Sequence, residues 1–224
     1  MDNNVKNALV ASLDKFAAVS GKDSGEMGQE LISVFSKDLG FLEKVEEFDA
    51  VFDAHASFED LREVFFDLLM VNFFASDVQK LEDDYLETDE WADIEEETID
   101  RGTELLNLLL YINECHDEEI RPELGDFLTE FLLVEEDEFQ DEFHIYEDLI
   151  SNQQLAESSI EDIISHKNMV DLGEEIEMLF VPFMAFFSQP KATAEAYKEL
   201  EDFSSDKEFD SAVYALITTF NEKN

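Results

Sequence analysis

The chain has few cations, few helix breakers and a single cysteine. Of 224 residues, Lys and Arg total 14, Gly totals 7, Pro totals 3, and Cys115 is the one cysteine. One cysteine excludes an internal disulfide framework. The densest apolar stretch, 178–187, is far shorter than the roughly 18 residues that a membrane-spanning helix needs. Because the first twenty residues also lack the apolar run of a signal peptide, we expect a cytoplasmic protein.

Motifs of catalysis and cofactor binding are missing as well. The sequence contains no G-x-S-x-G, no G-x-x-x-x-G-K-[ST], no G-x-G-x-x-G and no calcium-binding loop, and its four histidines are scattered without an H-E-x-x-H pattern. Cys115 lies beside Glu114 and Asp117, and negative neighbours raise a thiol pKa, which disfavours a nucleophile. We therefore expect no enzymatic activity, no cofactor and no specific metal site.

Acidic residues dominate what is present. Asp and Glu total 58, which gives a net charge of −44, yet 45% of the residues are hydrophobic and 21 are Phe. This composition predicts a folded protein and not a disordered acidic tail. Since like charge at this density destabilises a compact state, we expect it to be retained for function or for solubility in high salt. Salt adaptation is the weaker explanation, because we expect it to reduce Lys and large apolar residues.

Helical spacing of apolar residues recurs along the chain. In 58–71 they fall at positions 58, 61, 64, 65, 68, 69 and 71, which is one face of a helix, widened by Phe66 and Met70. We predict an all-α, single domain over 1–224, built as a bundle or irregular array of about ten to twelve short helices. Weak similarity between the segments after His55, His116 and His166 is compatible with a diverged helical repeat. The predicted helices are 4–19, 25–38, 41–54, 58–74, 77–86, 90–114, 121–134, 136–150, 159–167, 171–187, 191–202 and 206–221.

The same periodicity gives a predicted core dominated by Phe and Leu. The expected core residues are Phe65, Phe66, Leu68, Leu69, Leu105, Leu108, Phe127, Phe131, Leu132, Leu179, Phe180, Phe183 and Leu216.

The negative charge is concentrated in the middle of the chain. Residues 81–166 contain Arg101 and Arg121 against 30 acids, so their net charge is 2 − 30 = −28, whereas the flanks hold 12 cations and 28 acids and net −16. The middle is therefore the predicted partner-binding region. Its candidate residues are Asp83, Asp84, Glu87, Asp89, Glu90, Trp91, Asp93, Glu96, Glu97, Asp100, Asp117, Glu118, Glu119, Glu135, Glu136, Asp137, Glu138, Asp141 and Glu142.

Carboxylates on a helix can form rows that imitate the backbone of a nucleic acid. Residues three or four apart have Cβ atoms about 5–6 Å apart. At one charge per about 1.7 Å, a charge of −28 corresponds to roughly 48 Å of duplex DNA. The leading hypothesis is a non-enzymatic acidic protein that occludes a basic, nucleic-acid-binding surface of a partner protein. Nucleic acid and membranes are not expected as direct partners, since both are negative.

In charge and helix content the chain resembles phage and plasmid proteins that imitate DNA to block restriction or repair enzymes. Two alternatives stay open. One is an immunity protein that neutralises a basic toxin or nuclease, with Tyr85, Trp91 and Tyr146 as aromatic anchors among the acids. Those three side chains are equally compatible with packing into the core. The other alternative is an acidic scaffold or chaperone for basic proteins.

Overall fold

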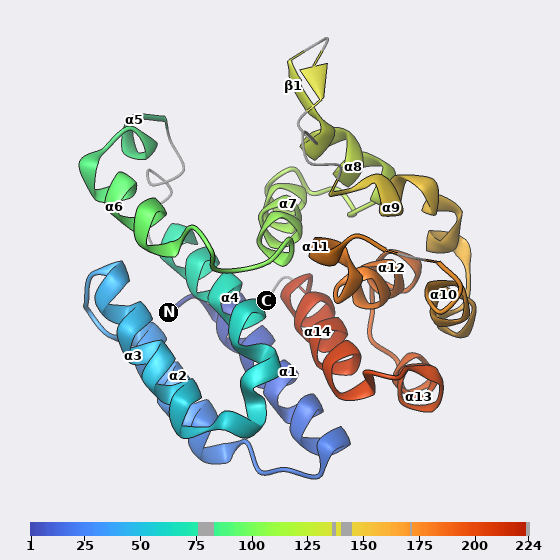
Figure 1. The fold of residues 1–224 in the computed structure, drawn as a ribbon, viewed down its shortest axis with the longest axis horizontal. Helices are drawn as coiled ribbons and strands as arrows, with labels where there is room; N and C mark the ends of the chain where they lie inside the picture. The colour runs from blue at the N-terminus through green and yellow to red at the C-terminus, as the bar shows by residue number, and fades with distance from the viewer. Residues whose placement is uncertain (76–82, 136–137, 140–144, 171, 223–224) are drawn as a thin grey trace.

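The protein is all-α, as predicted, apart from one short hairpin (Figure 1). The computed structural model describes residues 1–75, 83–135, 138–139, 145–170 and 172–222. Within them, twelve α-helices have five or more residues. These are α1 (Asn3–Ser20), α2 (Gly25–Ser36), α3 (Phe41–Ala54), α4 (Arg62–Ala75), α6 (Asp89–Thr98), α7 (Leu105–Asp117), α8 (Leu124–Leu132), α9 (Glu147–Ser151), α10 (Ile160–Lys167), α12 (Phe180–Ser188), α13 (Ala194–Phe203) and α14 (Lys207–Phe220).

Shorter elements complete the described chain. They are the single-turn helices α5 (Asp83–Leu86) and α11 (Glu174–Glu177), the 3-10 helices η1 (Ala56–Leu61) and η3 (Gln153–Glu157), and the strands β1 (Leu133–Glu135) and β2 (Glu138–Phe139). The two strands pair antiparallel, with Leu133 opposite Phe139. In Figure 1 this hairpin projects away from the helices.

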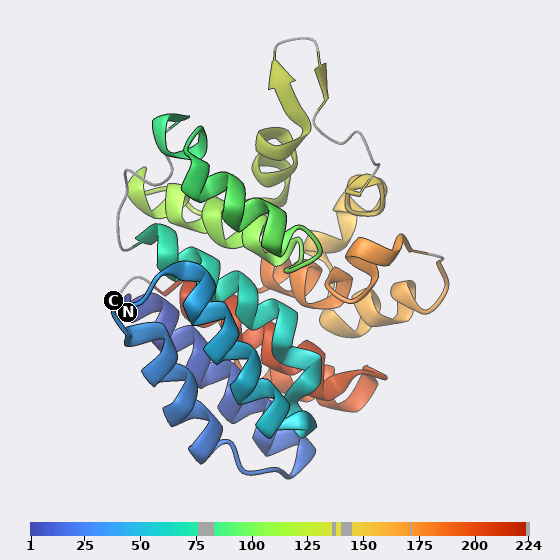
Figure 2. The ribbon, with the colours of Figure 1, turned by 60° about the vertical axis from the view of Figure 1, so that its left-hand side comes forward.

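Helices from the two ends of the chain form the centre of the fold. The first helix, α1, packs extensively along the last long helix, α14, and α4 packs against both α1 and α7. Figure 2 shows α1–α4 stacked on one side of the molecule, while α8–α13 occupy the other. This arrangement follows from the composition of α14, whose residues from Phe209 to Thr218 are all buried. A helix that is apolar on most of its surface is stable only when neighbours cover it on several sides.

The buried side chains form one hydrophobic cluster that extends from Val5 to Phe220. Every predicted core residue whose side chain is described is buried; Phe131 and Leu132 lie outside that part. Aromatic rings contact one another throughout, as in the edge-to-face pair of Phe127 and Phe183, whose ring centroids are 6.4 Å apart. Burial of each such side chain contributes roughly 1.5–3 kcal/mol, which opposes the repulsion between the surface acids.

The prediction of one helix over 90–114 is wrong, because the structure has two helices with a break between them. α6 ends at Thr98 and α7 begins at Leu105. Gly102 lies in the break with a φ of +83°, a backbone conformation that ends a helix and that side chains with a Cβ rarely adopt. Hydrogen bonds from the break to α4, described below, hold it in place.

Three other predicted helices also differ from the structure. The helix over 58–74 is divided into η1 and α4, and the helix over 121–134 ends at Leu132, where β1 follows. The helix over 171–187 is divided into α11 and α12; residue 171 lies outside the described chain. Pro182, which has no N–H to donate, falls in the first turn of α12, where that donor would have no partner within the helix.

Two predicted helices fall partly on residues that the structure does not describe. In the helix over 77–86 only α5 is described. In the helix over 136–150 the described parts are the strand β2, a turn at 145–146 and α9, so the prediction is wrong at 138–139 and 145–146. The repeat and the single-domain organisation stay predictions.

Candidate acidic interaction surface

Helix α6 carries the densest described group of predicted site residues. It begins after Thr88, whose hydroxyl accepts a hydrogen bond from the Trp91 backbone N–H at 3.2 Å. Asp89 and Glu90 occupy the first turn, where carboxylates interact favourably with the positive end of the helix dipole. Ten residues of this helix include six carboxylates, and all six are exposed.

The buried face of α6 is narrow. Trp91, Ile94 and Thr98 are spaced three and four apart and face the core, with Ile94 only 2% exposed. The Trp91 ring packs against Phe74 of α4, with centroids 5.6 Å apart, and against Tyr85 at 6.2 Å. The apolar contacts that fix α6 therefore come from one side, and the rest of its circumference faces solvent.

Carboxylates occupy the opposite side of the helix. At 100° per residue, Asp89, Asp93 and Glu96 lie directly across the helix from the Trp91–Thr98 face, and Asp100 continues the line beyond the helix end. We call these four residues the outer row; all four are exposed. Glu90 and Glu97 lie on one flank of the row. Glu95, on the other flank, is an exposed carboxylate that the sequence analysis did not select, although it belongs to the same acidic run.

Asp117, Glu118 and Glu119 form a second predicted group at the end of α7, and all are exposed. Glu119 has a φ of +58°, and the following N–H, of Ile120, donates to the Cys115 carbonyl at 2.9 Å to close the helix end. Carboxylates at a helix C-terminus face the negative end of the dipole, which costs roughly 0.3–1 kcal/mol each. Local stability therefore does not explain these acids.

The remaining predicted residues are only partly described. Glu87 is exposed between α5 and α6. The backbones of Asp83 and Asp84 are in α5, and those of Glu135 and Glu138 are opposite each other in the hairpin, while their side chains lie outside the described part. Glu136, Asp137, Asp141 and Glu142 lie outside the described residues. The structure thus places Asp89, Asp93, Glu96 and Asp100 in one row, with Glu90 and Glu97 on its flank, whereas Trp91 faces the core and the α7 group lies on a separate helix.

A polar clasp after α6 fixes this helix to α3 and α4. The Arg101 guanidinium donates to both carboxylate oxygens of Asp49, at 3.0 and 3.1 Å, and its Nε donates to Glu63 at 3.1 Å. The guanidinium also lies over the Phe66 ring, 4.7 Å from its centroid. The Gly102 backbone N–H donates to Glu63 at 2.7 Å.

Asp67 forms the buried end of the clasp. This aspartate is 1% exposed and accepts hydrogen bonds from the Thr103 backbone N–H at 3.0 Å and the Thr103 hydroxyl at 2.5 Å. Burial raises the pKa of Asp67 well above its usual value, because the charged form loses hydration that these two bonds only partly replace. A Cβ on Gly102 would lie 2.6 Å from the Asp67 carboxylate, so both the conformation and the contact require glycine there.

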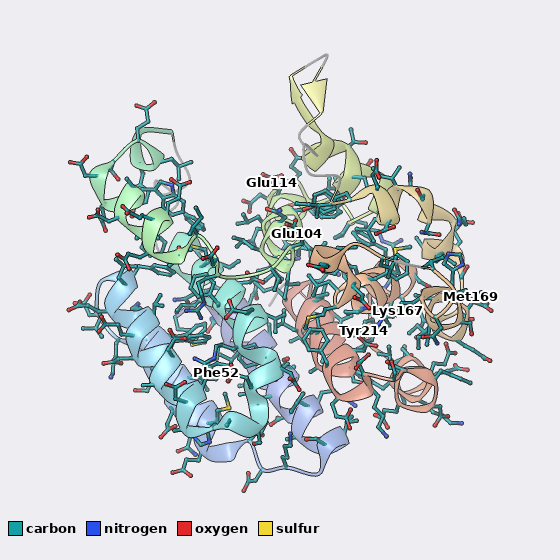
Figure 3. All side chains as sticks on the ribbon, in the orientation of Figure 1. Phe52, Glu104, Glu114, Lys167, Met169 and Tyr214 are labelled. Atoms are coloured by element: carbon teal, nitrogen blue, oxygen red, sulfur yellow. The ribbon has the colours of Figure 1, made fainter. Side chains whose placement is uncertain are left out.

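The clasp removes the nearest cation from the α6 surface. Arg101 is the only Lys or Arg between residues 81 and 120, and its charge is directed toward Asp49 and Glu63. Within the described residues, no ion pair involves a carboxylate of α6. Figure 3 shows side chains that end in oxygen around much of the outline of the molecule, and exposed acids occur on many helices, so acidity alone does not distinguish this surface. What distinguishes α6 is number: six exposed carboxylates lie on one helix, and none of them forms an ion pair with a described residue.

The aromatic candidates do not form exposed anchors. Tyr146 is 5% exposed, packs edge-to-face on Phe127, and its hydroxyl donates to Glu104 and accepts from the Asn107 side chain. Tyr85 and Trp91 are half-buried and contact each other against α4. Of the two interpretations of these rings, core packing is the one that the structure supports.

The described residues also bear on a reactive thiol, a metal site and a membrane-spanning helix. Cys115 is 1% exposed, and burial, with Glu114 and Asp126 adding to it, raises the pKa of its thiol. Among the described residues, no group of three or more His, Cys, Asp or Glu is placed to hold a metal ion. None of the helices described combines the length and hydropathy that a bilayer-spanning segment requires.

No protein-family model, curated protein or solved structure matches this chain.

Proposed function

We propose that the protein is a non-enzymatic acidic binding protein that occludes a basic, nucleic-acid-binding surface of a partner protein. One observation carries this proposal: α6 presents an outer row of carboxylates with no described counter-charge, on a helix fixed to the core along its other face. Helix α6 has the sign, charge density and rigidity that a phosphate-binding surface would recognise.

Charge density supports imitation of a nucleic acid. Ten helical residues rise about 15 Å, so the six carboxylates of α6 correspond to one charge per roughly 2.5 Å of axis. Duplex DNA carries one charge per about 1.7 Å and a single strand one per about 3.4 Å. The linear charge density of α6 therefore lies between that of a single strand and that of a duplex.

Rigidity supports the same function. The cap at Thr88, the packing of Trp91 and Ile94, and the clasp at Arg101 hold α6 at its start, middle and end. A helix fixed before binding loses little conformational entropy when the partner arrives, which favours affinity. Excess negative charge also accelerates association with a basic surface at low salt.

The proposal is tested by affinity capture followed by competition with DNA. The full chain is immobilised, proteins are captured from an extract of the source cells, and bound proteins are eluted with a short DNA duplex. We expect the duplex to elute nucleic-acid-binding proteins. Retained proteins that duplex DNA leaves on the column would contradict imitation of DNA. A single retained protein of this kind would instead favour the immunity-protein alternative.

A matched pair of charge reversals tests the assignment to α6. D93K/E96K changes two residues of the outer row, whereas E195K/D202K makes the same change in net charge at two exposed positions of α13. We expect D93K/E96K to weaken capture by about tenfold or more at moderate salt and E195K/D202K to weaken it by less than about threefold. Equal losses from both variants would contradict a specific role for α6.

A further inference from the structure

A cavity of about 440 Å³ lies where the C-terminal ends of α4, α7 and α14 meet the start of α1. Its floor is apolar and is formed by Val71 and Phe74 of α4, Leu110 of α7 and Phe220 of α14. The volume falls within the range of about 300–1,000 Å³ that is typical of binding pockets. Figure 2 shows the N-terminus at this edge of the molecule.

The rim of this cavity is negative for two separate reasons. Asp2, Glu114 and Asp117 contribute exposed carboxylates, and α4, α7 and α14 end at the cavity, each with about half a negative charge at its C-terminus. The positive N-terminal end of α1 also lies here, and the Asp2 carboxylate caps it by accepting hydrogen bonds from the Asn4 and Val5 N–H groups. No Lys or Arg is found among the described lining residues. His116 lines the wall, and its Nε2 lies 3.0 Å from the Asn221 carbonyl oxygen.

The cavity adjoins the α6 surface through a shared side chain. Phe74 forms part of the floor and also contacts Trp91, which holds α6 from beneath. The outer row lies on the side of α6 that faces away from Phe74. The row and the Phe74 ring are therefore separated by about one helix diameter, roughly 10 Å. A single partner is large enough to contact both features.

We propose that this cavity binds a basic amphipathic helix of the partner protein. An apolar side chain of that helix packs against the floor. Flanking Lys or Arg side chains form ion pairs with Asp117 and Asp2 and interact with the carbonyl groups at the C-terminal ends of the helices. Charge complementarity selects this occupant. A purely polar cation would make no apolar contacts with the floor, and an uncharged apolar segment would form no ion pairs with the rim. Docking of an amphipathic helix into an apolar groove is a common mode of recognition. The inference rests on the proposed function, because it specifies how the same basic partner is held.

The test uses two synthetic 14-residue peptides with equal charge. One has Lys on one helical face and Leu on the other, and the second has Ser in place of every Leu. Binding of each labelled peptide to the full chain is measured by fluorescence anisotropy in 150 mM salt. We expect the Lys–Leu peptide to bind at least about tenfold more tightly than the Lys–Ser peptide, because only the former can fill the apolar floor.

A cavity-filling variant localises the binding. Asn113 is half-buried and lines the cavity, so Asn113→Trp fills it without changing the charge; Asn168→Trp makes the same substitution at an exposed position after α10. We expect Asn113→Trp to abolish the preference for the Lys–Leu peptide and Asn168→Trp to preserve it. If Asn113→Trp does not fold, as judged by circular dichroism, Leu110→Gln weakens the same floor at a half-buried position.

Two results would overturn the inference: equal affinity of the wild-type protein for both peptides, or unchanged preference in the folded Asn113→Trp or Leu110→Gln variant. Failure of the proposed function gives a different result. If D93K/E96K weakens both peptides while the cavity variants weaken neither, the acidic-surface proposal stands and the cavity is not the site. If the cavity variants weaken peptide binding and D93K/E96K does not, the assignment of binding to α6 is wrong.

Discussion

Helices α6 and α13 are built alike but differ in charge. Each has ten residues, and each begins after a threonine that caps it, Thr88 or Thr193. Each is followed by a hydroxyl that donates to a buried aspartate: Thr103 to Asp67 and Ser204 to Asp210, both at 2.5 Å. The chain therefore uses the same local devices twice to hold a short surface helix.

The outer faces of these two helices are not alike. α6 has six carboxylates and no cation, whereas α13 has four carboxylates and includes Lys198. Lys15 of α1 also approaches α13, where its Nζ lies 3.7 Å from Glu201 and 3.7 Å from the centre of the Tyr197 ring. Since α13 shows that such a helix folds with partly balanced charge, folding does not require the excess on α6. This difference is the reason for assigning that excess to binding.

The largest expected effect comes from breaking the clasp that follows α6. Gly102→Ala places a Cβ at a φ of +83° and 2.6 Å from the Asp67 carboxylate. We expect it to lower the free energy of unfolding by about 2–4 kcal/mol, because strain and a steric clash add. Chemical denaturation measures this change.

Gly125→Ala is the control, since Gly125 is in α8 and a Cβ there meets nothing within 4 Å. We expect no loss of stability from this substitution and a gain of up to about 1 kcal/mol. A Gly102→Ala protein as stable as the Gly125→Ala protein would show that the clasp does not hold α6.

The second largest effect is a pH dependence of stability caused by Asp210, the buried aspartate at the end of α13. Burial raises the pKa of Asp210 to about 7, although the Ser204 hydrogen bond and Lys167 lower it. The folded protein thus binds this proton more tightly than the unfolded chain, whose Asp pKa is about 3.9. Stability should therefore increase as pH falls from about 7 toward 4, by up to about 1.4 kcal/mol per pH unit. Asp67, whose pKa is also raised by burial, contributes in the same direction.

Thermal unfolding between pH 8 and 5.5 measures this dependence. We expect Asp210→Asn to raise stability at pH 8 by about 1–3 kcal/mol and to reduce the slope. The exposed Asp202→Asn should leave the slope unchanged. A melting temperature that falls steadily from pH 7 to 5.5 in the wild-type protein would contradict the prediction.

The smallest expected effect is the change in folding stability when like-charge repulsion is relieved on α6 or on α13. At low salt, D93K/E96K should stabilise the fold by about 0.5–1 kcal/mol, because neighbouring like charges on a helix destabilise it by about 0.2–0.5 kcal/mol per pair. E195K/D202K should have less effect, since α13 already has cations nearby. Both differences should vanish at 1 M salt, where screening acts within about 3 Å. An equal gain from both variants at low salt would remove the distinction between α6 and α13.

Much of the fold follows from periodicity in the sequence. The helix over 41–54 is confirmed with its exact ends, and the core predicted from apolar spacing is buried wherever side chains are described. The prediction of one helix over 90–114 is wrong because the chain breaks at Gly102, whose φ of +83° ends a helix. The partners that interrupt it, Asp49, Glu63 and Asp67, lie 36 or more residues away in sequence.

In the candidate site, too, some features follow from local spacing in the sequence and others depend on contacts with distant segments. The spacing of Trp91, Ile94 and Thr98 within an acidic run is enough to place Asp89, Asp93 and Glu96 on one exposed face. The loss of Arg101 as a neighbouring cation is not predictable in this way, because its ion pairs are made with α3 and α4. Nor is the cavity beside α7, whose floor joins residues from position 71 to position 220.

By itself, the sequence determined that the chain is helical, that Phe and Leu fill its interior and that its middle segment is strongly negative. These properties depend on hydrogen bonds and side-chain spacings within a few residues, and on a simple count of charges. Only the tertiary structure decided where α6 ends, which carboxylates have a cation beside them and where an apolar floor meets a negative rim. Those features depend on contacts between distant segments, which local spacing does not encode.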